Sequence, residues 1–474
     1  MGLVIVLPEI VLLVAACLAL LVEVYRGPRS VDLTFFTALA GLLATLLATL
    51  YVFPETAEYG FAGTVVNDPL SVVLRALIAA MGIFMFAYGR EYFARSGTLR
   101  GEYFALGLFV LLGAMVISVG SNMLTLYLGL ELLSLSMYAL VAMERDSLAA
   151  SEAAIKYFVL GAIASGMLLY GVSMIYGATG SLDLMEIAIA AAEGDANPQI
   201  LSFGLVFVVI GIAFKLGVVP FHMWVPDVYQ GAPTPITLFI SSIPKLASFA
   251  LAFRILAEAL GPMANEWQDI LYPLALLSMV IGNLVAIAQR NVKRMLAYST
   301  IAHMGFLLMG FLAASDGGYA SAMFYAIVYA FSSMAAFAIV ILVAAGGHDT
   351  DQLSDFAGLA QRSPWFGFVA IAVFFSLAGV PPFPGFWAKW FVIKEAVDVG
   401  FVILAVVAVV ASVIGAYYYL NLLKIMCFDP PEDVKSPEAS SDFRLVLSVN
   451  ALVVLLLGLS PGLLMQVCLR VTGG

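Results

Sequence analysis

The chain has 474 residues, of which 63% are hydrophobic and only 11% are charged, and its formal net charge is −10. Soluble domains contain about 25% charged residues, so this composition excludes a soluble globular protein and indicates an integral membrane protein. The acidic residues are spread over short loops, which indicates loop solvation rather than a binding surface, and nothing in the charge pattern predicts a nucleic-acid partner.

Apolar stretches of membrane length recur along the whole chain. A hydrocarbon core about 30 Å thick needs roughly 20 apolar residues per helix. At that scale the sequence predicts an all-α polytopic protein with about fourteen transmembrane helices in a single transmembrane domain, 1–474. The predicted helices cover 3–22, 32–53, 69–89, 103–119, 122–142, 153–177, 200–226, 234–260, 269–289, 292–313, 319–345, 365–396, 400–427 and 444–466. The first stretch is too long for a cleavable signal peptide, so we expect it to remain as helix one.

Lysine and arginine predict the orientation. They gather in the loops after odd-numbered helices, at Arg26, Arg29, Arg90, Arg95, Arg100, Arg145, Arg290, Lys293, Arg294, Arg362, Lys435 and Arg444. The even-numbered loops hold none, and only Arg470 in the tail departs from the pattern. The positive-inside rule therefore predicts a multi-pass protein of the bacterial inner membrane with both termini on the periplasmic side.

Predicted helix five carries an acidic residue at membrane depth. Glu131 lies in the segment LGLELLSLSMY and has no cation at i±3 or i±4 on its own helix. A carboxyl group there titrates near neutral pH if its surroundings change modestly, which is typical of a proton switch. The alternative is a structural ion pair between helices.

Predicted helix seven is interrupted near a buried lysine. Lys215 stands in the middle of the segment GIAFKLGVVPFHMW, and Pro220 follows five residues later. A central lysine costs roughly 2.5 to 3.5 kcal/mol on membrane insertion, so such a residue usually faces protein or water on an ion pathway. Proline removes a backbone donor, and broken helices at membrane depth line hydrated cavities or protein. His222, beside Pro220, is a further candidate for bridging the break.

Helices eight and ten add further candidates. Lys245 lies near the middle of helix eight, just after Pro244, and burial makes a lysine a plausible proton carrier. A static charge pair with Glu131 is the alternative for Lys215 and Lys245. His303 in helix ten lies among Tyr298, Ser299 and Thr300, and it is either a relay or a packing residue. We interpret Lys293 as a surface charge that sets topology, and Arg75, Arg254 and Lys394 as snorkelling or structural residues.

Helix twelve repeats the interruption of helix seven. Gly217-Val-Val-Pro-Phe221 recurs as Gly379-Val-Pro-Pro-Phe383, and a tryptophan follows each copy. The odd number of helices between the copies predicts inverted repeats, about 103–260 and 269–427, with peripheral helices in 1–102 and 444–466. Lys389, after the second break, is a candidate carrier on the outward half of the helix. Snorkelling to the outer interface is the alternative.

Motifs for several other functions are absent from the sequence. It has no GxxxxGK[ST] loop, no paired CxxC and no histidine pairs at haem spacing. Cys17, Cys427 and Cys468 fall at no metal-ligand spacing, so we expect packing roles and neither a disulfide nor a metal site. We therefore expect no cofactor in this chain, which must take its energy from partners.

The motifs of helices five, seven, eight and twelve together resemble the antiporter-like subunits of respiratory complex I. The resemblance covers nearly the whole chain, and FKLGVVPFHMWVPDVYQGAPTP in helix seven is its most specific part. Lysine rather than glutamate at 389 and a chain that ends soon after its last predicted helix are expected of a smaller member of the family, because the largest paralogue carries a long lateral helix.

The resemblance implies a proton channel inside a proton-translocating NADH:quinone oxidoreductase. Glu131 is then the switch that pairs with Lys215, Lys245 the connecting carrier and Lys389 the exit-side carrier, with His303 between them. NADH, FMN, iron–sulfur clusters and quinone belong to other subunits, and the partners are other membrane subunits of the complex, the lipid bilayer and protons. The alternatives are a subunit of an Mrp-type cation/proton antiporter or membrane-bound hydrogenase, and a mainly structural scaffold.

Overall fold

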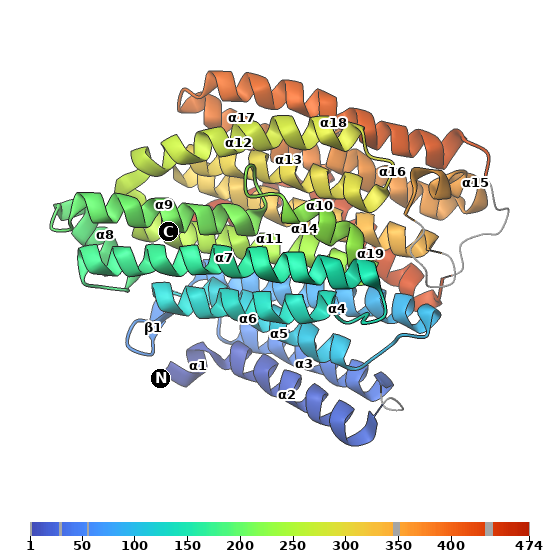
Figure 1. The fold of residues 1–474 in the computed structure, drawn as a ribbon, viewed down its shortest axis with the longest axis horizontal. Helices are drawn as coiled ribbons and strands as arrows, with labels where there is room; N and C mark the ends of the chain where they lie inside the picture. The colour runs from blue at the N-terminus through green and yellow to red at the C-terminus, as the bar shows by residue number, and fades with distance from the viewer. Residues whose placement is uncertain (1, 28–30, 55, 345–350, 432–438, 474) are drawn as a thin grey trace.

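The helices of the protein run side by side along one common direction (Figure 1). The computed structural model describes residues 2–27, 31–54, 56–344, 351–431 and 439–473. The first part of the chain forms α1 (Gly2–Ile5), α2 (Leu7–Arg26), α3 (Val31–Tyr51), β1 (Glu58–Gly60), β2 (Val65–Asn67), α4 (Pro69–Ser96), α5 (Glu102–Val119), α6 (Met123–Val141), α7 (Leu148–Thr179), α8 (Leu184–Glu193), α9 (Pro198–Leu216), α10 (Trp224–Gly231) and α11 (Thr234–Ala252). The second part forms the π-helix η2 (Phe253–Ala259), η3 (Gly261–Met263), α12 (Ala264–Ile287), α13 (Val292–Leu312), α14 (Asp316–Val343), η4 (Leu353–Phe356), α15 (Leu359–Arg362), α16 (Pro364–Ala378), α17 (Pro384–Asp398), α18 (Val402–Phe428), α19 (Ser441–Leu459) and α20 (Pro461–Thr472).

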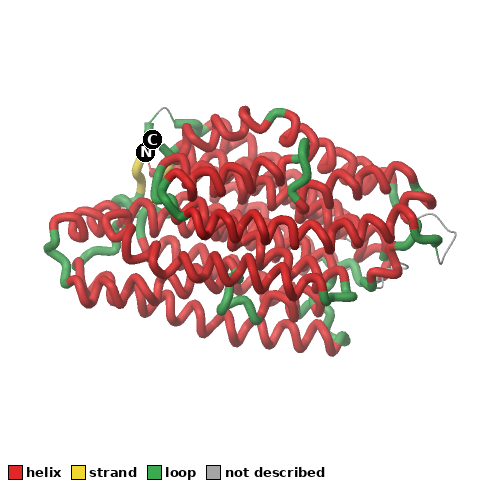
Figure 2. The backbone as a smooth tube through the Cα atoms, turned by 90° about the horizontal axis from the view of Figure 1, so that it is seen from above, coloured by secondary structure: helices red, strands yellow, loops and turns green. Residues whose placement is uncertain are grey.

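The predicted all-α membrane architecture is confirmed. Thirteen helices in the described part of the chain are long and apolar enough to cross a membrane. The remaining prediction, 365–396, corresponds to α16 and α17, which are separated by the second helix break. Both ends of the described chain lie at the same end of the bundle (Figures 1 and 2). Of the residues used to predict orientation, Arg29 and Lys435 lie outside the described residues.

Three predicted boundaries are wrong in detail. The loop 54–68 contains a short antiparallel hairpin in which Tyr59 faces Val66, and 178–199 contains helix α8. The last predicted helix, 444–466, is two helices, because α19 ends at Leu459 and α20 begins at Pro461. Proline has no backbone N–H to continue a helix and is favoured in its first turn, so the chain restarts there.

Polar residues at the ends of the apolar stretches fix where several helices begin. The side chain of Asn122 accepts a hydrogen bond from Leu124 N at the start of α6, and Asn197 and Asn291 cap α9 and α13 in the same way. These caps satisfy backbone N–H groups that have no partner within the helix. They therefore set the register of the helices that carry Glu131, Lys215 and His303.

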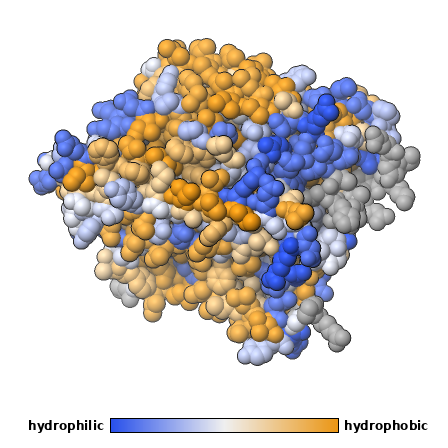
Figure 3. Space-filling view, in the orientation of Figure 1, coloured by the Kyte–Doolittle hydropathy of each residue, from blue (hydrophilic) through white to orange (hydrophobic). Residues whose placement is uncertain are grey.

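The most deeply buried helices lie at the centre of the bundle. The membrane-length segment 234–259 is buried along its whole apolar window, and α13 and α14 are 94% buried over theirs. By contrast, α2 and α19 are only 33% buried, and α18 is 39% buried. Hydrophobic side chains cover much of the visible face and hydrophilic residues gather mainly toward its left and right margins (Figure 3). Lys245 and His303 thus belong to central helices, far from any lipid-facing surface.

Candidate functional site

The first helix break is formed by a glycine at the end of α9. Helix α9 ends at Leu216, and Gly217 takes the left-handed conformation with φ 77°. Its N–H donates to the carbonyl groups of Ala213 and Phe214, a C-terminal cap that favours glycine because no Cβ clashes there. The chain resumes as α10 at Trp224, whose indole N–H donates to Phe214 O over 3.0 Å. The predicted interruption of helix seven is therefore real.

Lys215 and Lys245 meet at this break. Both side chains are buried, at 9% and 0% exposure. Lys215 Nζ donates to Ser134 Oγ on α6 over 2.7 Å. Lys245 Nζ donates to Leu216 O over 2.7 Å and to Lys215 O over 3.3 Å. The last carbonyl groups of a helix lack partners and carry the negative end of its dipole, so they stabilise an ammonium group without a carboxylate.

The expected direct pair between Glu131 and Lys215 is not formed in the structure. Among the described residues, no ion pair within 4.0 Å involves Lys215, and Glu131 Oε1 is buried without a hydrogen-bond partner. The charge of Glu131 still acts on Lys215 at longer range. Ser134 lies three residues further along α6, almost one turn away, and takes the ammonium group in place of the carboxylate.

Glu131 belongs to the outward-facing side of α6. The half-buried carboxylate shares this stripe with Leu124, Leu128 and Leu135, which are 44%, 60% and 54% exposed. The spacing of four, three and four residues places all four on one helix face. Glu131 is therefore between the lysines of the first break and the outer surface of the chain.

A small cavity lies beside Lys215. It has a volume of about 10 Å³ and is lined by Ser134, Tyr157, Lys215, Trp224, Ser248 and neighbouring apolar residues. This is close to the minimum space for one water molecule, and the hydroxyl and ammonium groups supply polar partners. The first break thus combines two buried ammonium groups with space for one water.

The second break has the same construction. Helix α16 ends at Ala378, Gly379 is left-handed with φ 86°, and α17 begins at Pro384. Lys389 is 8% exposed, and its Nζ donates to Ala378 O over 2.9 Å. The ammonium group also lies 5.2 Å from the centre of the Phe306 ring. The snorkelling alternative is wrong, because the side chain turns inward to the end of α16.

His303 lies in a chain of hydroxyl groups near the second break. Its Nδ1 is 2.6 Å from Tyr325 Oη and its Nε2 is 3.1 Å from Tyr419 Oη. Tyr419 Oη in turn hydrogen-bonds to Ser299 Oγ. A cavity of about 10 Å³ opens beside the imidazole, lined by His303, Tyr325, Tyr329, Ser332, Ser376 and parts of α17. The structure brings His303 and the helix that carries Lys389 to one polar site.

His222 is less well connected. It is half-buried in the segment between α9 and α10, and its Nδ1 is buried without a hydrogen-bond partner among the described residues. Its backbone carbonyl accepts from Val225 N and so helps to start α10. The geometry brings Lys215 and Lys245 together, and His303 with α17, but it does not join His222 to either group.

A large open cavity lies where the arginine-rich loops meet. It has a volume of about 790 Å³, and its lining includes Arg100, Arg145, Lys156, Asp227 and Arg294. We call this end of the bundle the basic end. The cavity reaches Gly231 and Pro233, which flank the end of α10. It therefore brings solvent close to the second half of the broken helix.

Asp227 is the centre of an ion-pair cluster in this cavity, a role that the sequence did not reveal. Its two carboxylate oxygens lie 2.7 Å from Lys156 Nζ and 2.9 Å from Arg294 Nη1. Burial raises the pKa of the Asp227 carboxyl, but hydrogen bonds and the charges of Lys156 and Arg294 outweigh it and hold the pKa below its usual range. The one available signal was an acidic residue in the WVPDVY segment directly after the break.

The interpretation of Lys293 as a surface charge is wrong. Lys293 is 0% exposed, and its Nζ donates to Ala232 O over 2.8 Å. The residue is at the beginning of α13, where a sequence places it at the membrane edge, but the end of α10 and the segment around Asp351 cover this turn of α13. Position within a span did not predict exposure here.

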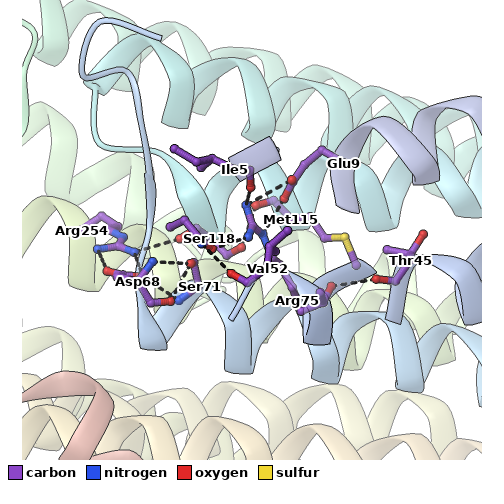
Figure 4. Close-up of polar contacts among 12 residues, drawn as sticks. Ile5, Glu9, Thr45, Val52, Asp68, Ser71, Arg75, Met115, Ser118 and Arg254 are labelled. Atoms are coloured by element: carbon purple, nitrogen blue, oxygen red, sulfur yellow. Dashed lines mark hydrogen bonds and ion pairs between the residues drawn. The ribbon is translucent and has the colours of Figure 1, made fainter. Parts of the chain in front are cut away.

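Arg75 and Arg254 are structural, as expected (Figure 4). Arg75 is fully buried and pairs with Glu9 over 2.7 Å, while a second nitrogen donates to Asn67 Oδ1. Arg254, in the π-helix η2, pairs with Asp68 at the start of α4 and with Glu258. Lys394 is an exposed residue paired with Asp398. The two arginines connect the N-terminal helices to each other and to the end of α11.

Comparisons with known proteins agree with this architecture. Residues 120–415 match the family described as NADH:quinone oxidoreductase/Mrp antiporter, TM. The NADH-quinone oxidoreductase subunit N of Alkalilimnicola ehrlichii is 51% identical over 469 residues, which cover 98% of this chain and 96% of that protein.

Two solved structures share the fold. A chain of respiratory complex I from Thermus thermophilus superposes with a TM-score of 0.83 at 31% identity, over 97% of this chain and 98% of that chain. A chain of the Mrp complex from Dietzia sp. DQ12-45-1b superposes with a TM-score of 0.87 over 100% of this chain and 97% of that one, but at 22% identity it shows similarity of fold alone. The chain belongs to the NADH:quinone oxidoreductase/Mrp antiporter family of membrane subunits, and within that family it groups with the proteins named NADH-quinone oxidoreductase subunit N.

Proposed function

We propose that this chain is a proton-translocating membrane subunit of NADH:quinone oxidoreductase (complex I). The names of its relatives and the Thermus structure support its place in that complex. In this role the chain carries no redox group, and NADH, FMN, iron–sulfur clusters and quinone are held by other subunits. Quinone reduction in neighbouring subunits supplies the energy for proton transfer through Glu131, Lys215, Lys245, His303 and Lys389.

One observation carries the proposal. Among the described residues, no ion pair involves Lys215, Lys245 or Lys389, although all three are buried. Their ammonium groups instead meet a serine hydroxyl or helix-end carbonyl groups. A scaffold that uses buried charge for stability requires paired charges, because an unpaired ion is costly to bury. Lysines that are bound only by neutral acceptors can release a proton without leaving a carboxylate unpaired.

The exposed stripe of α6 suggests how energy reaches these lysines. Glu131 has an unpartnered oxygen and lies between Lys215 and the outer surface. A neighbouring membrane subunit that docks on this stripe changes the charge balance at Glu131. Moving one charge against 100 mV costs roughly 2.3 kcal/mol, which is within the range that a change in ion pairing at Glu131 and Lys215 can supply.

The two breaks also support the proposed internal organisation. Helices α9 and α16 both end at a left-handed glycine whose neighbouring carbonyl groups bind a lysine. We propose inverted repeats over about 103–260 and 269–427, with 1–102 and 444–466 peripheral, both termini in the periplasm and the basic end in the cytoplasm. Labelling of cysteines placed in each tail, in intact cells and in inverted vesicles, tests this orientation.

The test of function is NADH-driven proton uptake and NADH:quinone activity in membrane vesicles that carry Lys215→Ala. Native gels establish that the complex assembles. Lys424→Ala is the matched control, because Lys424 is 63% exposed and pairs only with Asp429 near the end of α18. We expect the Lys215 variant to assemble and to lose both pumping and coupled turnover.

Either of two results would overturn the proposal. Normal pumping with Lys215→Ala removes the central carrier. Failure of assembly in step with activity favours the scaffold role instead. Mass spectrometry of the native complex separates complex I from an Mrp-type antiporter or a membrane-bound hydrogenase, since only complex I brings NADH-binding and flavin-binding partners.

A further inference from the structure

Lys293 has the same kind of contact as two of the proposed carriers. It is fully buried, and its Nζ donates to the carbonyl oxygen of Ala232, the residue that follows α10. Lys245 binds the end of α9 in this way, and Lys389 binds the end of α16. All three helix ends belong to the two broken helices. Lys293 therefore shares the chemical setting of the carriers, although nothing in its sequence position predicted it.

Lys293 lies directly behind the wall of the large cavity at the basic end. The cavity is lined by Gly231 and Pro233, which flank Ala232, and by Asn291 and Arg294, which flank or nearly flank Lys293. Solvent thus reaches both sequence neighbourhoods of the Lys293–Ala232 contact, while the ammonium group itself is closed off. A small local movement of α10 is enough to bring water to it.

On the inner side, α13 leads from Lys293 to His303. Thr300 and His303 follow it by seven and ten residues, which places them on the same side of the helix, about 10 and 15 Å further along. Thr300 Oγ1 accepts a hydrogen bond from Tyr329 Oη over 2.7 Å. The Tyr329 ring lies 5.1 Å from the imidazole of His303, between ring centres.

Tyr229 supplies a hydroxyl group near the start of this route. It precedes Ala232 by three residues on α10, and its buried side chain lies beside Thr300 and Tyr329. Its hydroxyl makes no hydrogen bond among the described residues. A buried hydroxyl without a partner costs roughly 1–3 kcal/mol. Its position is understandable if it forms a hydrogen bond transiently, with a water or a neighbouring hydroxyl.

We propose that Lys293 is a further proton carrier, which takes protons from the cavity at the basic end and passes them through Tyr229, Thr300 and Tyr329 to His303 and Lys389. This route enters the second half of the chain without passing Lys215 or Lys245. In each step the donor's N–H or O–H bond breaks as the acceptor's bond forms, and Lys293 regains its proton from cavity water. The inference rests on the proposed function, since it adds an entry to the same proton pathway.

The test compares Lys293→Met with Lys293→Arg in vesicles that contain the assembled complex. Arginine keeps the charge but does not release its proton in proteins. We expect both variants to lower NADH-driven proton uptake by about tenfold or more, because a positioned proton-transfer group contributes roughly 10²- to 10⁴-fold to its step. Arg290→Met is the matched control, because Arg290 is an exposed cation in the same loop that does not line the cavity, and we expect it to pump normally.

Tyr229→Phe keeps the test decisive even where a Lys293 variant fails to assemble. Its hydroxyl has no hydrogen bond to lose, so the substitution disturbs folding little. We expect reduced proton uptake with normal assembly. Tyr103→Phe is its control, because Tyr103 is equally buried and donates only to Met85 O, away from the route.

Three outcomes overturn the inference. Normal uptake in Lys293→Arg with loss in Lys293→Met means that a fixed charge suffices. Normal uptake in Tyr229→Phe removes the hydroxyl route. Normal uptake in both Lys293 variants, beside a defective Lys215→Ala, removes the second entry and leaves the proposed function intact. If Lys215→Ala also pumps normally, the proposed function fails as well.

Discussion

The ammonium group of Lys245 lies 2.7 Å from the carbonyl oxygen of Leu216, the last residue of α9. A lysine from the most deeply buried helix thus terminates a helix that the chain itself has broken. The helix end supplies partial negative charge without a carboxylate. This arrangement depends on the left-handed glycine that follows Leu216, because that residue turns the chain away and leaves the carbonyl group free.

Substitution of that glycine tests how far the site depends on the break. A Cβ at Gly217 would lie 2.6 Å from Val225 Cγ2 and 3.5 Å from Lys245 Nζ, at a φ of +77°. The left-handed conformation alone costs a non-glycine residue roughly 1–2 kcal/mol. We expect Gly217→Ala to lower both thermal stability of the complex and coupled NADH:quinone turnover.

Gly166→Ala is the matched control for this change. Gly166 is in the middle of α7, and a Cβ there would meet nothing within 4 Å. Alanine in a helix interior is about 0.5–1 kcal/mol more favourable than glycine. Equal behaviour of the two variants in melting and turnover would show that the break tolerates an ordinary helix end.

The buried pair of Arg75 and Glu9 predicts a large stability effect. Removal of one member leaves the other charged and buried, which typically costs about 3–5 kcal/mol. We expect Arg75→Met to unfold at a clearly lower temperature than the wild-type chain in detergent. Arg90→Met is the comparison, since Arg90 pairs with an exposed Asp32 and such pairs contribute about 0–1 kcal/mol. Similar melting temperatures for the two variants would argue against the clamp.

The pH dependence of stability should identify the Asp227 cluster. Because the pKa of Asp227 is lowered in the folded chain, its contribution is present above the pKa of the unfolded chain, about 3.9 for aspartate, and is lost as the pH falls through the lowered value. We expect Asp227→Asn to melt below wild type at pH 7, and the difference to shrink as the pH falls below about 4. A difference that is constant with pH would assign the effect to packing.

Much of this fold follows from one-dimensional patterns. The fourteen apolar stretches, the glycine and proline at each break, and burial of Lys215, Lys245 and Lys389 were all predictable, because hydrophobic length and backbone chemistry are local properties. The partners of the lysines were not. Lys245 binds a carbonyl on another helix, and a sequence does not reveal which backbone groups a distant helix leaves unsatisfied.

Lys293 and Asp227 show the second limit. Both lie near predicted span ends, where a residue seems equally suited to water or to protein. Their environment depends on α10, a helix of 8 residues that exists only because the chain breaks at Gly217. Its end covers Lys293, and its first turns hold Asp227 against Lys156 and Arg294. Predicting the break did not reveal what its short second half would cover.

The stripe on α6 leads to the last prediction. Glu131→Gln keeps the shape of the side chain and removes its charge, while the exposed leucines around it are unchanged. Because no hydrogen bond or ion pair within this chain holds Glu131 Oε1, we expect normal assembly on native gels and a fall in protons taken up per NADH. Glu131→Asp should restore part of the uptake, since a carboxylate remains on the same helix face. Full proton uptake with glutamine would mean that the charge at this position plays no part in coupling, and loss of assembly would show that the carboxylate serves to dock a neighbouring subunit.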